Sequence, residues 1–354
     1  MRRDIMCIGG TSQWPATIFR GVDQWGEPYG YLLVDPIGGA IGAFATGDGI
    51  STGGQSRTPI CKLPNVEHTE QSFPLLFLYR KEITDSGGAG KWRGGMSAES
   101  CFIPHRTKSI TQDTLSSGNA IPTSPGMMGG YPGSVNVYKF KRETDIKKLF
   151  SNSTMPKAIE DVKGQDETLQ LRQENFQQNP SDVYAVIWSA AGGFGDPLER
   201  DPEKVRADVV DHRSVSAEAA KQIYGVLLRG ESVDAEGTRR FRAERRAAYI
   251  AKKAPEKIKE KITLNLTDSL DLRGGKLCCA KCAADLGPAT GNYKERCVRY
   301  DAEIAAANPN IGDWKRYIDE RPVFRQFHCP GCGALLENEI AREDDELLRD
   351  IELS

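Results

Sequence analysis

The sequence has 354 residues, enough for two or three folded units, and its 39% hydrophobic and 27% charged content is that of a globular protein with a sizeable core. A formal net charge of −2 gives no general reason to expect nucleic acid or an anionic membrane surface as a partner. The most apolar stretch, residues 31–45, is interrupted by Asp35, Pro36 and glycines, and is shorter than the ~20 apolar residues of a membrane-spanning helix. We therefore expect no nucleic-acid and no membrane partner.

The nine cysteines are unevenly distributed along the chain. Six lie between residues 278 and 332, whereas Cys7, Cys61 and Cys101 stand alone. This clustering is typical of a metal site in a reducing compartment rather than of a disulfide framework. Because no apolar run of secretory length follows Met1–Asp4, we expect a cytoplasmic protein.

Residues 1–140 combine short apolar runs with dense turn-forming clusters. The runs at 31–34, 73–79 and 134–138 are rich in β-branched and aromatic residues, which is typical of strands. Most of the 36 glycines precede residue 200, which indicates tight turns and loops lined by backbone. This part is therefore predicted to be β-rich, with long ordered loops.

The next segments change in character. Residues 141–180 are polar, which predicts an exposed excursion, and a strand is expected at 183–189 before a glycine turn at 192–195. Asp201–Pro202 predicts a helix start, since aspartate can cap and proline suits the first turn, and that helix should run to about Asp211. A second helix is expected from Ser216 to Tyr224.

Residues 236–263 are strongly helical and basic, with a break expected at Pro255. A nucleic-acid or membrane helix is one interpretation of this pattern. We favour a solvated linker helix that touches an acidic partner surface, because acids elsewhere in the chain balance its charge.

Two CxxC pairs carry the clearest chemical signal. Thiolates separated by two residues can reach one metal ion, and two such pairs supply the four soft ligands of tetrahedral zinc. Proline and glycine inside the second pair suit a tight turn, and the 46 residues between the pairs must form a folded insertion. The predicted ligands are Cys279, Cys282, Cys329 and Cys332. With four cysteine ligands the zinc would be structural, because no position is left for substrate or water.

Alternatives to this ligand set stay open at the level of sequence. Cys278 could replace Cys279, although the two-residue spacer fits Cys279 better. Cys297 and His328 are further possible ligands, which we interpret as neighbouring or packing groups. A redox-active CxxC pair is the rival interpretation of the motif.

Anion contact is the best candidate chemistry in the first two-thirds of the chain. Lys91 and Arg93 lie in the glycine-rich run 85–95, where they could meet phosphate or carboxylate, although the run lacks Walker spacing and also suits a structural turn. Glu67 and His68 form the one mixed acid–imidazole cluster, for which substrate or partner contact is a better hypothesis than metal binding. No catalytic residue is assigned.

Several of these motifs together resemble a known family. The glycine blocks and their flanking residues, in order along about 1–228, are similar to the C-terminal half of the hydantoinase B/oxoprolinase family; they are 38–39, 48–49, 64–67, Glu70, Pro74, 85–95, 125–126, 129–130, 132–133, 192–197 and 201–226. Residues of about 275–340 resemble the small zinc-binding subunit of acetone and acetophenone carboxylases, through Cys279, Cys282, 292–294 and 329–333.

The resemblance implies a multi-subunit, ATP-dependent enzyme. A hydantoinase A-like subunit would bind ATP and activate the substrate, while a divalent metal would belong to the N-terminal half of hydantoinase B. That half has no counterpart in this sequence, so a separate subunit is expected to supply it, and no metal ligand of that site is transferred here. Ketone and bicarbonate are the implied substrates.

From these inferences we expect an α+β protein of three parts. They are a β-rich glycine-loop domain with C-terminal helices (1–228), a basic helical linker (229–264) and a small zinc-ribbon-like domain (265–354). The leading hypothesis is a ketone carboxylase subunit that forms part of the active chamber and a zinc-stabilised docking module. The alternatives are a subunit of a hydantoinase- or oxoprolinase-type amidohydrolase and a non-catalytic assembly or regulatory protein.

Overall fold

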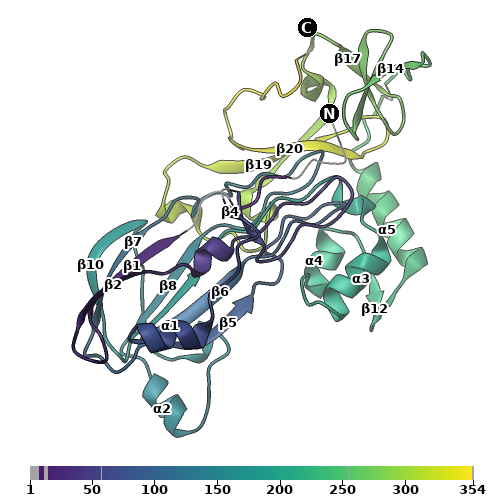
Figure 1. Cartoon of the computed structure of the whole chain (residues 1–354). Helices are drawn as coiled ribbons and strands as arrows, with labels where there is room; N and C mark the ends of the chain where they lie inside the picture. The colour runs from purple at the N-terminus through teal and green to yellow at the C-terminus, as the bar shows by residue number, and fades with distance from the viewer. Residues whose placement is uncertain (1–7, 12–14, 57, 254, 353–354) are drawn as a thin grey trace.

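The computed structural model describes residues 8–11, 15–56, 58–253 and 255–352 (Figure 1). Met1–Asp4 and Cys7, used above to infer localisation, lie outside the described residues. The predicted α+β class is confirmed: β-sheets dominate, three of the helices gather beside one end of the body, and a small cysteine-bearing β module ends the chain. Among the described residues, no helix is both long and apolar enough to cross a membrane.

Two antiparallel sheets pack face to face at the end of the body far from the C-terminus (Figure 1). Aromatic residues such as Phe19, Phe102 and Tyr184 fill the space between them and are fully buried. The first sheet has the order β10 (Arg172–Gln178), β7 (Ile110–Leu115), β1 (Ala16–Val22), β2 (Pro28–Leu32). The second has the order β5 (Leu75–Glu82), β6 (Ala98–Pro104), β11 (Val183–Ile187), β8 (Val137–Arg142), β9 (Gln165–Glu167).

The prediction that 141–180 is only an exposed excursion is wrong. This segment contributes β9 and β10, and α2 (Ile146–Ser151) covers the outer face of the second sheet with the buried side chain of Ile146. The pairing of β10 with β7 is non-local, which is why a polar run could not reveal it. Helix α1 (Val66–Ser72) packs on β5, and β3 (Gly54–Gln55) pairs with β4 (Thr58–Pro59).

Glycine-rich loops extend the body beyond the sandwich as closely stacked backbone. Trp92 and Phe194 exchange two backbone hydrogen bonds (3.0 and 2.9 Å), and Gly193 donates to the carbonyl of Tyr131 (2.9 Å). A Cβ on Gly130 would overlap the carbonyl of Gly193, so only glycine allows this approach. The glycine content of this region is therefore explained by backbone packing as well as by turns.

Three helices lie beside these loops. The predicted starts of α3 (Pro202–Val210) and α4 (Ala217–Gln222) are confirmed, because the side chains of Asp201 and Ser216 each accept a hydrogen bond from an amide of the first turn (both 3.0 Å). Helix α5 (Ala235–Ala247) follows the short hairpin formed by β12 (Leu228–Arg229) and β13 (Ser232–Val233).

Helix α5 is shorter than expected: helix was predicted over 236–263 with a break at Pro255, but α5 ends at Ala247 and β14 (Ile262–Asn265) occupies the end of that range. Beyond Ala247 the backbone amides find acceptors in the C-terminal module: Ala251 donates to the carbonyl of Pro330 (3.0 Å) and Ile258 to that of Ala283 (2.9 Å). Tertiary hydrogen bonding thus ends a helix that local propensity would continue.

The C-terminal module consists of two antiparallel sheets. One has the order β14 (Ile262–Asn265), β15 (Leu270–Arg273), β16 (Lys276–Cys279), β17 (Asp285–Pro288), and the other β18 (Val298–Glu303), β19 (Pro322–His328), β20 (Leu335–Arg342). The residues between the two CxxC pairs are therefore the folded insertion that was predicted. Short 3₁₀ helices occur at Asp35–Gly38, Ile159–Asp161, Pro197–Glu199, Tyr293–Arg296, Ile304–Ala306 and Trp314–Arg316.

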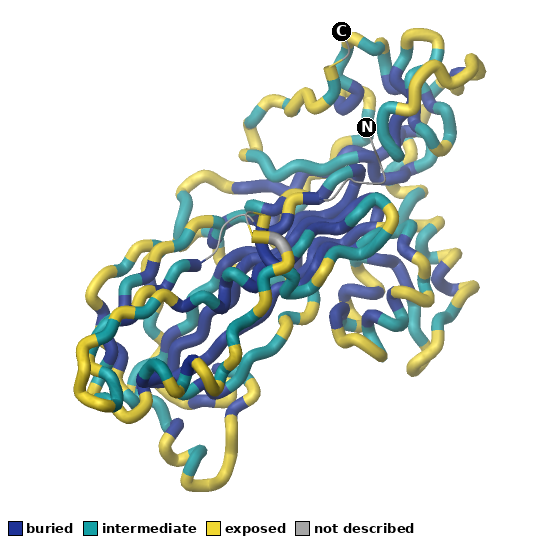
Figure 2. Tube along the Cα trace, viewed as in Figure 1, coloured by how far each residue is buried: buried dark blue, intermediate teal, exposed yellow. Residues whose placement is uncertain are grey.

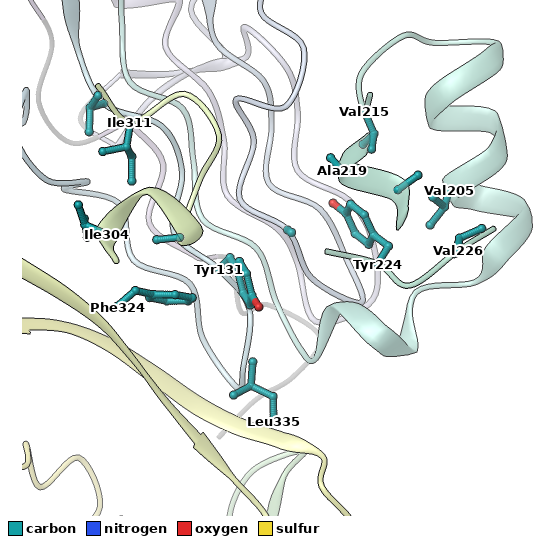
Figure 3. Close-up of a cluster of buried hydrophobic side chains, with 14 residues drawn as sticks. Tyr131, Val205, Val215, Ala219, Tyr224, Val226, Ile304, Ile311, Phe324 and Leu335 are labelled. Carbon is teal, nitrogen blue, oxygen red and sulfur yellow. The ribbon is translucent and has the colours of Figure 1, made fainter. Parts of the chain in front are cut away.

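One hydrophobic core joins the module to the body (Figure 3). Phe324 and Leu335 from the second sheet belong to one buried cluster with Tyr131 of a glycine loop, and the same cluster extends to Val205 and Tyr224 of the helical region. The rings of Tyr131 and Phe324 are 4.9 Å apart at a steep angle, an edge-to-face pair. Figure 2 shows buried residues running continuously from the sandwich through the loops to this junction.

Candidate metal centre

The four cysteines predicted as metal ligands lie together. Their sulfur atoms are all within 4.8 Å of one another, with 3.9 Å between Cys279 and Cys332 and 3.6 Å between Cys282 and Cys329. Cys279 ends β16 and Cys329 follows β19, so each pair begins where a strand turns. Four converging sulfurs match the tetrahedral sulfur coordination of zinc and of iron–sulfur sites.

Both turns have the same backbone design. The amide of Ala283 donates to the carbonyl of Cys279, and the amide of Gly333 donates to that of Cys329 (both 2.8 Å). The amides of these same two cysteines each donate to the carbonyl of the residue five positions later (3.0 and 2.8 Å). Gly333 has φ +69°, a left-handed conformation that favours glycine. The amide of Gly331 donates to the sulfur of Cys329 (3.4 Å), as expected for a thiolate that backbone amides stabilise.

The alternative ligands are engaged elsewhere. Cys278 contacts the carbonyl of Lys276 (3.6 Å), and Cys297 that of Tyr293 (3.4 Å). The ring of His328 stacks on Tyr249 with centroids 3.7 Å apart. Among the described residues, the four predicted cysteines are the only group of three or more side chains arranged to hold a metal ion.

The two cysteine turns also contact the body. Lys281, inside the first CxxC pair, forms an ion pair with Glu199. Asp196 accepts hydrogen bonds from the backbone of Leu335 (3.3 Å) and from Arg246 of α5 (3.1 Å). The four cysteines therefore lie where a bound metal ion would stabilise the junction between module and body. Arg246 of α5 pairs with acids of this chain, Asp196 and Glu199, and the expected contact with an acidic partner surface stays a prediction.

Lys91 and Arg93 occupy different environments. The Arg93 side chain is buried, donates to the carbonyl of Gly94 (2.7 Å) and lies 3.8 Å from a carboxylate oxygen of Asp208. Lys91 is exposed and lines a cavity of about 320 Å³ between the glycine loops and the module, together with Lys281 and Ser269. Of this pair, only Lys91 lines a cavity at the junction.

Glu67 and His68 lie on α1, at the opposite end of the molecule from β14 and β17 (Figure 1). Both are exposed, and the backbone amide of His68 is used in capping by Asn65 (3.0 Å). The structure therefore does not bring this pair together with Lys91 or with the four cysteines.

Sequence reasoning missed a buried charge network in the body. Arg200 donates to both carboxylate oxygens of Asp48 (2.6 and 2.8 Å) and twice to Asp208 (3.0 and 2.7 Å). Burial raises the pKa of Asp48, but the hydrogen bonds and charge of Arg200 outweigh it, so the pKa is lowered overall. The only signal in the sequence was the Asp48–Gly49 motif, because the partners are far apart along the chain.

Comparison with known proteins assigns the body. A family model described as hydantoinase B/oxoprolinase matches residues 2–197, more than half of the chain. The chain belongs to the hydantoinase B/oxoprolinase family. We call these residues the hydantoinase B part; they end before residue 228, the limit expected from the sequence. A model described as the acetone carboxylase gamma subunit matches residues 257–354, which we call the gamma-like part.

Curated relatives match over about two-thirds of this chain. The acetone carboxylase alpha subunit of Xanthobacter autotrophicus is 29% identical, over 66% of this chain and 32% of its own length. The acetophenone carboxylase delta subunit of Aromatoleum aromaticum is 29% identical, over 64% of this chain and 35% of its own. The chain thus spans about a third of the length of these two relatives.

Solved structures agree with this assignment. A nucleotide-free acetone carboxylase superimposes with a TM-score of 0.60 and 25% identity, covering 68% of this chain and 34% of the other. An ATP-dependent caprolactamase from Pseudomonas jessenii superimposes with a TM-score of 0.55 at 22% identity, covering 68% and 39%, and shares the fold.

Proposed function

We propose that this chain is a subunit of an ATP-dependent ketone carboxylase complex that joins a ketone to bicarbonate through a new carbon–carbon bond. One observation carries the proposal: a match to the acetone carboxylase gamma subunit stands on the same chain as the hydantoinase B part. The named carboxylase relatives and the acetone carboxylase structure support it. ATP and a divalent metal would be bound by partner subunits, among them a hydantoinase A-like chain.

The four cysteines are proposed to bind one structural zinc ion. Their convergence, the matched hydrogen bonding of the two turns and the contact of Lys281 with Glu199 support a docking role for the gamma-like part. Because such a site has no free coordination position, the zinc would hold the fold and take no part in the reaction. We propose that the chain divides at about residues 228 and 264 into a body, a linker and a C-terminal module, the first and last of which share one hydrophobic core.

Lys91 is our candidate for contacting an anionic group, such as phosphate or carboxylate, where subunits meet. Its exposure and its place beside the 320 Å³ cavity support this role, whereas the burial of Arg93 favours a structural one. Glu67 and His68 are proposed to contact a partner subunit at the other end of the body.

A second candidate function is a subunit of an ATP-dependent amidohydrolase. It is favoured by one relative, the caprolactamase subunit beta of Pseudomonas jessenii, which is 29% identical over 51% of this chain. A non-catalytic assembly or regulatory role is the third reading, since fold alone does not fix function.

Purification from the source cell with an affinity tag tests these readings. We expect large ATP-binding subunits to co-purify, and ATP hydrolysis to depend on ketone with incorporation of labelled bicarbonate. Lactam- or hydantoin-dependent ATP hydrolysis without bicarbonate incorporation would instead establish the amidohydrolase. Recovery of the chain alone would favour the assembly or regulatory role.

Lys91→Ala in the active complex should raise the substrate or ATP concentration needed for half-maximal rate. An unchanged concentration would exclude Lys91 as an anion contact.

A further inference from the structure

A cavity of about 410 Å³ lies where the helical region meets the second sheet of the gamma-like part. Helices α4 and α5 contribute residues to its wall, and so do strands β18 and β19 (Figure 1). The volume is in the range of about 300–1,000 Å³ that is typical of small-molecule sites. None of the residues proposed above to bind zinc or to contact an anion lines this cavity. It is therefore separate from the sites already described.

Aromatic side chains form much of the cavity wall. The rings of Tyr249 and Tyr300 meet edge to face with centroids 5.8 Å apart. Tyr131 and Phe324 form a second edge-to-face pair at 4.9 Å (Figure 3). Tyr300 is 47% exposed whereas Phe324 is buried, so the aromatic wall runs from the surface into the core. Such a wall favours a ligand with a flat apolar body, because aromatic rings pair edge to face or offset.

Arg245, near the end of α5, is the one cation among the lining residues that the structure describes. Its guanidinium donates one long hydrogen bond, to the carbonyl of Ile223 (3.4 Å), and it forms no ion pair within the described part of the chain. The neighbouring Arg246 instead pairs with Asp196 and Glu199. A guanidinium carries five N–H donors in a planar fork that matches a carboxylate. Arg245 therefore has donors left for an anion in the cavity.

The hydroxyl of Tyr131 is a second donor with capacity to spare. It accepts a hydrogen bond from the side-chain amide of Gln326 (2.8 Å), and no described residue accepts its own proton. Burial raises the pKa of Tyr131 to about 12, although the Gln326 hydrogen bond and the charge of Arg245 oppose this effect. The hydroxyl therefore keeps its proton at neutral pH, and Arg245 is near enough to act on it. The cavity thus offers a charged and a neutral donor.

Two carboxylates also line the cavity, on the side where α4 begins. Asp85 accepts a hydrogen bond from the amide of Ser216 (2.8 Å), and Glu218 lies in the first turn of α4. The carbonyl that Arg245 contacts belongs to Ile223, which caps the other end of this helix. Five helical residues advance about 7.5 Å along the axis, so the acids and the guanidinium are spaced apart along α4. An anion bound at Arg245 therefore meets the cation and not the acids.

We propose that this cavity binds a small aromatic carboxylate. The guanidinium of Arg245 and the hydroxyl of Tyr131 bind the carboxylate, and the rings of Tyr249, Tyr300 and Phe324 pack on the aromatic body. This inference goes beyond the proposed function and does not depend on it. Because the wall comes from both the helical region and the gamma-like part, a bound ligand stabilises the junction between them.

Isothermal titration calorimetry of the full-length chain tests the ligand class, with benzoate as the probe. Benzamide has nearly the same shape without the charge, and benzylamine carries the opposite charge. We expect benzoate to bind at least ~10-fold more tightly than either, because only benzoate forms a charge-assisted hydrogen bond with Arg245. Benzoate that fails to bind at about 10 mM, or that binds no more tightly than benzamide or benzylamine, would overturn the proposal.

Substitutions in the wall test the residues. Arg245→Met should weaken benzoate binding about 10- to 100-fold and leave benzamide binding unchanged. Arg240→Met is the matched control on the same helix, since the Arg240 side chain is 78% exposed and pairs with Glu244 at the surface; it should change neither affinity. Tyr300→Ala removes part of the aromatic wall at a half-exposed position and should weaken benzoate and benzamide alike. Unchanged benzoate affinity in either Arg245→Met or Tyr300→Ala would refute the assignment.

Crystals of the full-length chain soaked with 4-bromobenzoate locate the ligand independently of any substitution. We expect an anomalous bromine peak inside the cavity, among Tyr249, Tyr300 and Phe324, and the carboxylate at Arg245. Bromine bound only outside this cavity would contradict the proposal, even if calorimetry showed that benzoate binds.

Discussion

Replacing Arg200 by methionine should destabilise the body by about 4 kcal/mol, because breaking a buried ion pair from one side costs about 3–5 kcal/mol. The Asp208 side chain is 5% exposed and would lose two hydrogen bonds (3.0 and 2.7 Å), keeping the hydroxyl of Ser214 at 3.1 Å and the more distant guanidinium of Arg93 at 3.8 Å. The Asp48 side chain is 30% exposed, so water can replace part of the hydrogen bonding that it loses with Arg200. The contribution of the Arg200–Asp48 pair to the destabilisation should therefore be about 1 kcal/mol or less.

Urea unfolding followed by tryptophan fluorescence measures this loss, since Trp188 is fully buried in the body. Arg172→Met is the matched control, because Arg172 pairs with Glu174 on the surface (2.6 Å) and such pairs contribute about 0–1 kcal/mol. Equal decreases in the free energy of unfolding of Arg200→Met and Arg172→Met would refute the view that the Arg200 network holds the glycine loops to α3.

The pH dependence of the free energy of unfolding gives a second test of the Arg200 network. The lowered pKa of Asp48 in the folded protein stabilises it above the unfolded-state pKa of about 3.9, and this contribution disappears as pH falls below that value. Without Arg200, only the backbone amide and the charge of Arg93 oppose the effect of burial, so the pKa of Asp48 should be higher in the variant than in the wild type, and protonation of Asp48 should relieve the variant. The stability gap between wild type and Arg200→Met should therefore narrow from neutral pH toward ~4, and a constant gap would contradict this account.

The remaining predictions concern the gamma-like part. Cys329→Ser should reduce zinc from about one ion per chain to almost none and make β14–β20 sensitive to protease, whereas Cys278→Ser should retain the metal; metal analysis and limited proteolysis decide between these outcomes. Gly333→Ala should cost at least about 1–2 kcal/mol, because φ is +69° and a Cβ would overlap the carbonyl of Arg246, while Gly312→Ala, with open space around it, should cost little in the same urea titration. Burial raises the pKa of Glu337 to about 7, so stability should fall as pH rises from about 4.5 through 7, and Glu337→Gln should remove this slope; a slope retained in the variant would exclude Glu337 as its source.

Features set by neighbouring residues were predictable from the sequence. Asp201 and Ser216 cap their helices through amides two or three residues away, and each CxxC pair closes its own turn. Both depend on spacing that is visible in the chain. The convergence of the two turns followed from chemistry, because four soft ligands suit one metal ion better than two pairs kept apart.

Features set by distant residues were not predictable. The polar run that forms β10 is a strand because it pairs with the distant strand β7. Helix α5 ends at Ala247, and beyond it the amide of Ala251 donates to the carbonyl of Pro330 in the C-terminal module. Arg93 suggested an anion contact because its local context is glycine-rich and basic. Its burial near Asp208 depends on a fold that brings together residues more than a hundred positions apart.

The common core of Tyr131, Phe324 and Leu335 has a consequence for stoichiometry. The two parts that it joins match models named for different proteins, one of them a separately named gamma subunit. On a single chain they are always present in equal number, and a covalent connection gives them an effective concentration in the millimolar range or above. Dilution that would dissociate two separate subunits should therefore leave these two parts associated.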